Sequence, residues 1–378
     1  MKHNIFFKTI IIAGGSFILI ILIFTGFYTY WSAASPSKTC VRCHEISPSF
    51  NTWTASAHRE ISCFKCHGTA LGNGFHSLKE KSRMVLTHFK TDLPFQDLRM
   101  SENQLLETMD RCKNCHGSEY SNWLASGHSA GYADIFLNET HNQTEQLNAD
   151  CLRCHGMFFG KTTDELVEPL SKKGPWRLKE AEKAKQPVIP CMACHQVHSP
   201  GVTVRQPDYS SPDSIFKGRV LTNNSIGFYD RHEKSHFQLN NLPTPVMLLF
   251  GDTIKTPVDK VYRLCVQCHA PSVWHEVGSS DDHTPVGVHQ GISCNACHEP
   301  HSNYQRNSCD KCHPAISNCR LDVKTMNTTF LSPSSPNDIH FVSCKNCHQK
   351  EKRFLKSAFN RSGLPKNDFV KDPAARNN

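Results

Sequence analysis

One five-residue pattern, Cys-x-x-Cys-His, recurs nine times in this chain of 378 residues and uses eighteen of its nineteen cysteines. It is the attachment signature of c-type haem, because two such thiols add to one porphyrin and the adjacent His reaches its iron. The cysteine pairs are Cys40 and Cys43, Cys63 and Cys66, Cys112 and Cys115, Cys151 and Cys154, Cys191 and Cys194, Cys265 and Cys268, Cys294 and Cys297, Cys309 and Cys312, and Cys344 and Cys347. The histidines that follow them are His44, His67, His116, His155, His195, His269, His298, His313 and His348. We therefore expect nine covalently attached haem c groups.

Two other uses of cysteine pairs fit this pattern less well. Zinc sites also contain Cys-x-x-Cys, but zinc does not require a His after every second cysteine or an odd number of pairs. A disulfide within Cys-x-x-Cys closes too small a loop to hold together a domain of this size. Cys319 stands outside the motifs. We expect it to be a buried free thiol, with an intermolecular disulfide or an unusual ligand as alternatives.

The composition predicts a fold organised by its cofactors. Only 38% of the residues are hydrophobic, so side chains alone would form a thin core, and porphyrins must supply much of the buried surface. We expect a mainly α fold with extensive loop, little β-structure and one N-terminal transmembrane helix, and a haem-free chain unfolded outside the membrane. The expected parts are a cytoplasmic lead and anchor (1–31), a tetrahaem module (32–160), a connector (161–190), a pentahaem module (191–350) and a polar tail (351–378).

The formal net charge of +8 does not indicate nucleic-acid binding. Each haem carries two propionates, and nine haems would outweigh this positive charge. The lysines and arginines are therefore better understood as propionate partners, and we expect no nucleic-acid partner.

The N-terminal segment predicts a membrane anchor. Residues 9–31 are uncharged and mostly apolar, and as a helix they would span about 35 Å, enough for a hydrocarbon core of about 30 Å. Residues 27–31 form an aromatic belt, and Lys2 and Lys8 favour a cytoplasmic N-terminus. The haem part would then face the periplasm from the cytoplasmic membrane. A cleaved signal peptide is the alternative, because residues 32–34 form an acceptable cleavage site.

The first four motifs carry a family resemblance. A tight pair of motifs follows the anchor, with Cys-x-x-Cys-His-Glu at 40–45, Cys-x-x-Cys-His-Gly at 63–68 and the basic stretch Leu-Lys-Glu-Lys at 78–81. This arrangement resembles the NapC/NirT family of membrane-anchored quinol dehydrogenases. The resemblance implies that electrons pass from menaquinol or ubiquinol to a periplasmic reductase. One departure is Ile46, which stands where the family often has Met and cannot bind iron.

Further histidines are candidates for the second axial position of each iron. Two segments share the pattern Trp-x-x-Ser-x-His, and two motifs continue as Cys-His-x-x-His. In the second form the trailing His cannot turn back to its own iron, so it would serve a neighbouring haem. Other candidates stand just before a motif or between motifs. The predicted distal ligands are His58, His88, His128, His198, His289, His301 and His340. His232 and His236, at helical i, i+4 spacing, offer one more.

The second half resembles periplasmic multihaem electron-transfer cytochromes in motif and spacing. The 23 histidines suffice to give every iron two imidazoles, and a six-coordinate haem transfers electrons but cannot bind substrate. The sequence therefore favours an electron carrier of anaerobic respiration, which links quinol to a periplasmic redox protein or terminal reductase. The alternative is a multihaem oxidoreductase with one open haem, acting on nitrite, hydroxylamine or a compound of the tetrathionate class. Enzymatic activity is left open.

Overall fold

The structure is a computed structural model that describes residues 2–33, 41, 44–68, 86, 89, 100–199, 225–272, 274–277, 282, 284–302 and 340. Several predicted site residues lie outside the described part: Cys40, Cys43, His88, Cys309, Cys312, His313, Cys344, Cys347 and His348. The side chain of His44, Cys319, the 78–81 stretch and the polar tail lie outside it as well. Six attachment motifs are therefore described in full.

The chain forms two compact units. Unit 1 comprises residues 1–204, 222–241 and 301–303, and unit 2 comprises residues 205–221, 242–300 and 304–378. These units are defined by contacts between residues, whereas the expected modules are defined by the haems they carry. The module boundaries therefore stay a prediction.

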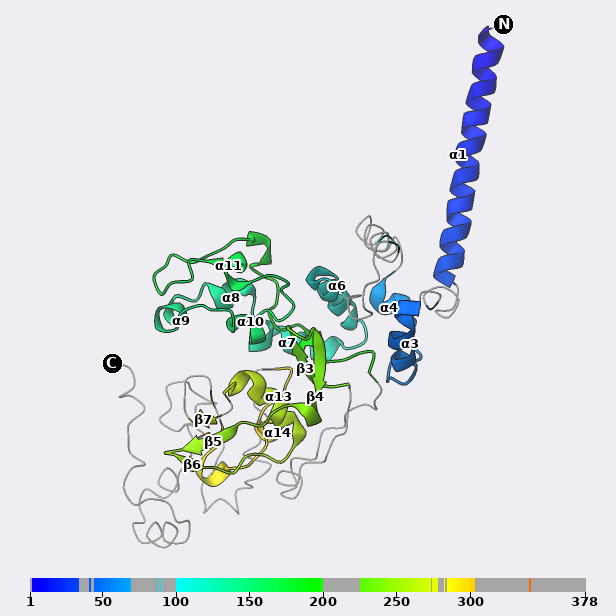
Figure 1. The fold of residues 1–378 in the computed structure, drawn as a ribbon. Helices are drawn as coiled ribbons and strands as arrows, with labels where there is room; N and C mark the ends of the chain where they lie inside the picture. Colours follow the sequence, from blue (N-terminus) through cyan, green and yellow to red (C-terminus); the bar gives the residue numbers. More distant parts are fainter. Residues whose placement is uncertain are drawn as a thin grey trace, which may run out of the picture. The chain divides into compact units, whose positions relative to one another are not determined.

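The first element, α1 (Lys2–Ala33), is a single long helix, drawn in blue in Figure 1. Its stretch Phe7–Tyr30 is 24 residues long, has a mean hydropathy of 2.6 and buries none of its side chains in the protein. A helix of this length and composition can cross a bilayer. The expected N-terminal apolar helix is therefore present.

Short helical segments make up most of the rest of unit 1. They are η1 (His44–Ile46), α3 (Ser47–Thr54), α4 (Cys63–His67), α6 (Glu102–Cys112), α7 (Gly117–Leu124), η3 (Gly127–Ser129), α8 (Tyr132–Phe136), α9 (Glu139–Thr144), α10 (Cys151–Cys154), α11 (Thr163–Leu166), η4 (Ala181–Lys183), η5 (Cys191–Ala193) and η6 (Leu239–Asn241). Two antiparallel pairs accompany them, β1 (Val167–Glu168) with β2 (Arg177–Leu178) and β3 (Gly227–Asp230) with β4 (Ser235–Gln238).

Residues 130–190, here called the apolar lobe, have a core made of their own side chains. Its buried members are Tyr132, Phe136, Leu147, Leu152, Phe159, Leu166, Val167 and Val188. The expected connector 161–190 is part of this lobe, because Val188 N–H donates to Ala130 O and Gly156 N–H donates to Val188 O. The segment is a structural part of the lobe and not a bare link.

The charged composition of residues 179–185 predicts an exposed helix, and this prediction is wrong. Only the single turn η4 forms, and Lys183 within it is 8% exposed. Its ammonium lies 2.5 Å from a carboxylate oxygen of Glu102, whose other oxygen accepts a 2.5 Å hydrogen bond from Tyr132. An ion pair with a partner far away in the sequence therefore overrides the local helical pattern.

The helical reading of His232 and His236 is also wrong, since they lie on the β3–β4 hairpin. The Asp230 carboxylate accepts from the backbone N–H groups of His232 and Glu233, which closes a tight turn. Lys234 has a φ of 48°, in the left-handed region that such turns use. The turn chemistry of Asp230 explains why the i, i+4 spacing does not produce a helix here.

Unit 2 contains a small sheet beside two helices and one helical turn. Its strands are β5 (Val246–Leu249), β6 (Asp252–Thr253) and β7 (Trp274–Glu276), in the order β6–β5–β7, and its helices are α13 (Lys260–His269), η7 (Gly287–His289) and α14 (Cys294–Cys297). Met247, Tyr262 and Val266 are buried at the centre of its core. The apolar run at 246–250 predicts a short strand or a buried segment, and β5 forms there. With short strands and many short helices, the described chain has the predicted mainly α class.

Candidate haem-binding sites

The described attachment motifs share one local geometry, a single helical turn. In four of them the N–H of the motif His donates to the carbonyl of the first cysteine, at 2.8 Å for His116 and His298, 2.9 Å for His155 and 3.0 Å for His195. Residues i, i+3 and i+4 of a helical turn lie on one face. Each motif thus presents two thiols and one imidazole to the same side, which is the arrangement that covalent haem requires.

None of the twelve cysteines in the six described motifs is part of a disulfide. Burial raises the pKa of Cys191 and Cys194 to about 11. Before haem attachment, these two side chains are therefore protonated thiols near neutral pH.

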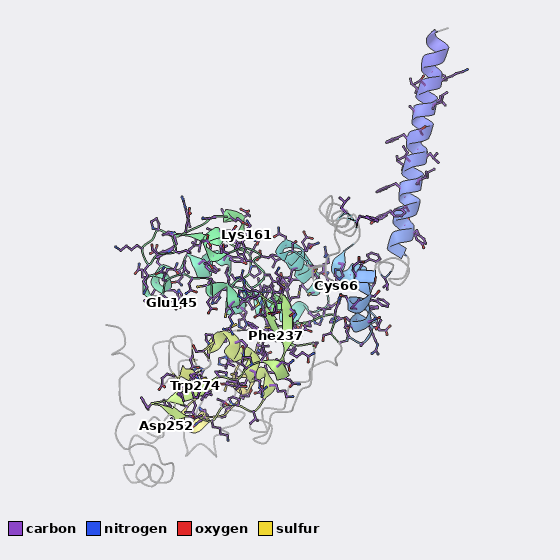
Figure 2. All side chains as sticks on the ribbon, viewed as in Figure 1. Cys66, Glu145, Lys161, Phe237, Asp252 and Trp274 are labelled. Carbon is purple, nitrogen blue, oxygen red and sulfur yellow. The ribbon has the colours of Figure 1, made fainter. Side chains whose placement is uncertain are left out.

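Three motifs, at 63–67, 112–116 and 191–195, meet in unit 1 and are here called the three-motif cluster. The Arg111 guanidinium on α6 donates to Cys66 O on α4 at 2.7 Å. Gly68, with a φ of +68°, lets the chain leave α4 directly after His67 and pass under Arg111. Figure 2 shows Cys66 on α4. Arg111 therefore joins the second motif to the helix that ends in the third.

The fifth motif packs against that same helix. Met109 of α6, Trp123 of α7 and Met192 of η5 share one buried cluster. The Trp123 indole N–H donates to Ile189 O at 3.2 Å, and Cys191 N–H points at Met109 Sδ at 3.4 Å. The fifth motif thus lies in the same compact unit as the second, third and fourth.

The β3–β4 hairpin holds the other side of the fifth motif. Gly227 N–H donates to Cys194 O at 3.0 Å, and His195 forms a β-bridge with Ile226. His236 on β4 places Nε2 2.6 Å from Met192 O, and its ring meets Tyr229 edge-on at 5.2 Å between centroids. In this arrangement His236 donates a hydrogen bond to the motif backbone, which sequence reasoning did not anticipate.

Four motif histidines each face a second histidine that belongs to a different segment. The ring centroids are 6.1 Å apart for His58 and His116, 5.8 Å for His67 and His198, 5.9 Å for His195 and His301, and 5.9 Å for His298 and His340. The first three pairs lie within unit 1 and the fourth lies within unit 2. In every pair, one member is the proximal histidine of an attachment motif.

This spacing fits an iron between the two rings. Metal–imidazole bonds are about 2 Å long, so two imidazoles on opposite sides of one metal have centres about 6 Å apart. Aromatic rings that merely pack in a core spread over a wider range, about 4.5 to 7 Å. The four separations differ by only a few tenths of an ångström, and the neighbouring cysteines supply the points of covalent attachment to the porphyrin. The residues present therefore fit covalently attached haem.

Desolvation, together with the nearby charges of His301 and His116, lowers the pKa of His195 to about 4. Burial also lowers the pKa of His198 and of His58. The shift favours the neutral form of imidazole, which is the form that binds a metal.

The Trp-x-x-Ser-x-His repeat produces the same local structure twice. Helices α3 and α7 each end just after the Trp, and the following serine, Ser56 or Ser126, is buried. Its hydroxyl accepts from the backbone N–H of His58 at 3.1 Å or of His128 at 3.2 Å. The repeat is therefore a structural unit that fixes the backbone of the trailing histidine.

The remaining described candidates lie as follows. His128 lies in a turn equivalent to that of His58, in the second copy of the repeat. His289 lies in η7, just before the motif that begins α14. His155 and His269 stand at the ends of α10 and α13. In unit 2, the thiols of Cys265 and Cys294 form a hydrogen bond, which raises the pKa of Cys294. The roles of these four histidines as iron ligands stay predictions.

Comparison with known proteins agrees with this geometry at both ends of the chain. Residues 2–162 match the NapC/NirT cytochrome c family, N-terminal region, and residues 250–299 match the family of cytochrome c554 and c-prime. This chain is a multihaem c-type cytochrome. Its N-terminal part is similar to the NapC/NirT family, as the sequence predicts, and c-type haem accounts for the thiol and imidazole pattern.

The cytochrome is also similar to the cytochrome c-type protein NrfH of Wolinella succinogenes. The two are 28% identical over 126 residues, which are 32% of this chain and 67% of the relative. No solved structure matches the chain. The fifth motif lies beyond residues 2–162, although in the structure it packs with the motifs inside that range.

Proposed function

We propose that this cytochrome carries nine haem c groups and takes electrons from the quinol pool, or from a quinol-oxidising partner, to a periplasmic acceptor. The observation that carries the proposal is the set of four histidine pairs. An iron with imidazole on both faces has no open position for substrate, and it changes redox state with little rearrangement. The pairs thus support a conductor of electrons and give no support to a catalytic pocket.

Two observations support the proposed electron entry at the membrane: the apolar helix α1 and the resemblance of residues 2–162 to the NapC/NirT family. We propose that α1 anchors the protein in the cytoplasmic membrane, with Lys2 and Lys8 on the cytoplasmic side and the haems in the periplasm. Quinol dissolved in the bilayer would then meet the haems nearest to the anchor. A soluble redox protein or a terminal reductase would accept the electrons on the periplasmic side.

The test uses the full chain in lipid nanodiscs under anaerobic conditions. We expect a naphthoquinol or benzoquinol to reduce most of the haems. The rise of the absorption bands of reduced haem measures this reaction. Mass spectrometry of the mature chain should show nine porphyrin additions. Failure of every quinol to reduce the haems would overturn direct oxidation of quinol; failure also in the presence of solubilised membranes that contain quinol-oxidising enzymes would overturn the quinol link. A ferric high-spin haem in the wild type that binds nitrite or hydroxylamine would favour the oxidoreductase alternative.

A further inference from the structure

One motif histidine of the NapC/NirT-like region lies opposite a histidine from outside that region. His67 belongs to the second motif, inside residues 2–162, yet the ring opposite it is His198. His198 follows the fifth motif, outside that region. His195, the proximal histidine of the fifth motif, faces His301, which lies still further along the chain but belongs to unit 1 by its contacts.

We propose that His198 is the second axial ligand of the haem on the second motif, and that His301 is the second axial ligand of the haem on the fifth motif. This assignment rests on covalent haem but is independent of the quinol link. The haem on the fifth motif would then belong to the same group as the haems on the motifs within residues 2–162. The two haems are then tied by one short segment, because His195 holds one iron and His198 holds the other.

Chain geometry supports the crossover at His198. Three residues reach at most about 11 Å, so His198 cannot pass around the porphyrin edge to the far face of the haem that His195 holds. The carbonyl and N–H groups around the fifth motif are also engaged, with Gln196 N–H donating to Ser225 O at 2.8 Å. His198 instead lies with its ring opposite His67, at 5.8 Å between centroids.

His236 is the competitor for the haem of the fifth motif, because it lies on the hairpin that packs against η5. Its Nε2 is occupied by the hydrogen bond with Met192 O, and its ring is held against Tyr229, which itself stacks on Phe158 at 4.0 Å. His301 is the histidine whose ring lies 5.9 Å from that of His195. The geometry therefore favours His301 as the ligand and His236 as a group that holds the motif backbone.

The ring angles make the two assignments separable by electron paramagnetic resonance. The planes of His195 and His301 differ by 18°, and those of His67 and His198 by 54°. Nearly parallel imidazoles act on the same iron d orbital and split the orbital pair, which gives a rhombic low-spin signal. Strongly rotated imidazoles leave the two orbitals close in energy, which gives a more anisotropic signal. Each substitution should therefore remove a different low-spin species.

The experiment compares the ferric spectra of the full-length wild type with those of H198A and H301A. We expect each variant to convert one haem per molecule from low spin to high spin. H301A should lose a rhombic signal, whereas H198A should lose a more anisotropic one. H198M and H301M, which keep the iron six-coordinate, should show a methionine–iron charge-transfer band and a raised potential at one haem.

The controls are H141A and H236Q. His141 is an exposed residue 3.6 Å from Glu145, and H141A should leave the spectra unchanged. H236Q should retain all low-spin haem. Wild-type spectra in both H198A and H198M would overturn the first assignment. A high-spin haem in H236Q, together with an unchanged H301A, would overturn the second. If quinol fails to reduce a wild type whose variants behave as expected, only the proposed function falls.

Discussion

The apolar lobe and the three-motif cluster lie in one unit but are held together in different ways. The lobe buries Tyr132, Phe136 and Leu152 completely, and its Lys183 forms an ion pair with Glu102 of α6. The cluster brings the thiols and imidazoles of three motifs together around a smaller buried group that includes Met109, Trp123 and Met192. We therefore expect the lobe to be stabilised mainly by its own side chains, and the cluster to depend on porphyrin for much of its core.

The largest effect should follow from removing the thioether links of the cluster. The variant replaces Cys63, Cys66, Cys112, Cys115, Cys191 and Cys194 by alanine. Hydrogen-exchange mass spectrometry should then show near-complete loss of protection in residues 44–68 and 102–124. Residues 131–190 should stay protected, because their core is built from side chains and the fourth motif, at 151–155, keeps its cysteines. Equal loss in both parts would mean that the lobe depends on the haems of the cluster as well.

A smaller but still large effect should follow from Lys183→Met in the lobe. Lys183 and Glu102 are each about 10% exposed in their side chains. Removing one partner of a buried pair leaves an uncompensated charge and costs about 3–5 kcal/mol. Thermal unfolding together with hydrogen exchange of the lobe measures this loss. The matched control, Lys161→Met, breaks the more exposed pair with Glu180 and should change little.

Gly156→Ala should destabilise the lobe by about 1–3 kcal/mol. Gly156 has a φ of +103°, and an added Cβ would lie 2.9 Å from the Tyr132 ring and 3.2 Å from Leu152. The control Gly160→Ala places its Cβ where nothing lies within 4 Å. Equal stability of the two variants in the same thermal assay would contradict the tight packing at Gly156.

The smallest effect should be that of Arg111→Met in the cluster. Hydrogen bonds to charged groups are worth about 1.5–3 kcal/mol in an ordinary fold, and Arg111 donates to Cys66 O at 2.7 Å. In the haem-loaded protein we expect a loss below about 1 kcal/mol, because thioether and iron bonds already hold the second motif. A loss as large as that of Lys183→Met would show that side-chain contacts also govern the cluster.

Local patterns in the sequence predict a good part of this structure. The apolar run of α1, the strand at β5 and the mainly α class depend on composition and periodicity over short windows. The attachment turns are equally local, since Cys and His at i, i+3 and i+4 share a helical face. The haem count and the second axial ligands stay predictions, tested by the experiments above.

Other features could not be predicted because their causes are distant in the sequence. Lys183 looks like part of an exposed charged helix until Glu102 is placed beside it. His236 looks like an iron ligand until the hairpin brings it to Met192 O. Asp230 is the exception, because its turn-forming side chain is a local signal that would have argued against a helix.

The sequence by itself determined where haem can be attached, which segment can cross a membrane and how much apolar surface the side chains can bury. These properties follow from residues within a few positions of one another. Only the tertiary structure decided which histidine faces which, because His198 and His301 reach His67 and His195 through packing between segments that are far apart in the chain. Closing such long loops costs entropy that no local pattern records, and the contacts that compensate for it exist only in the folded protein.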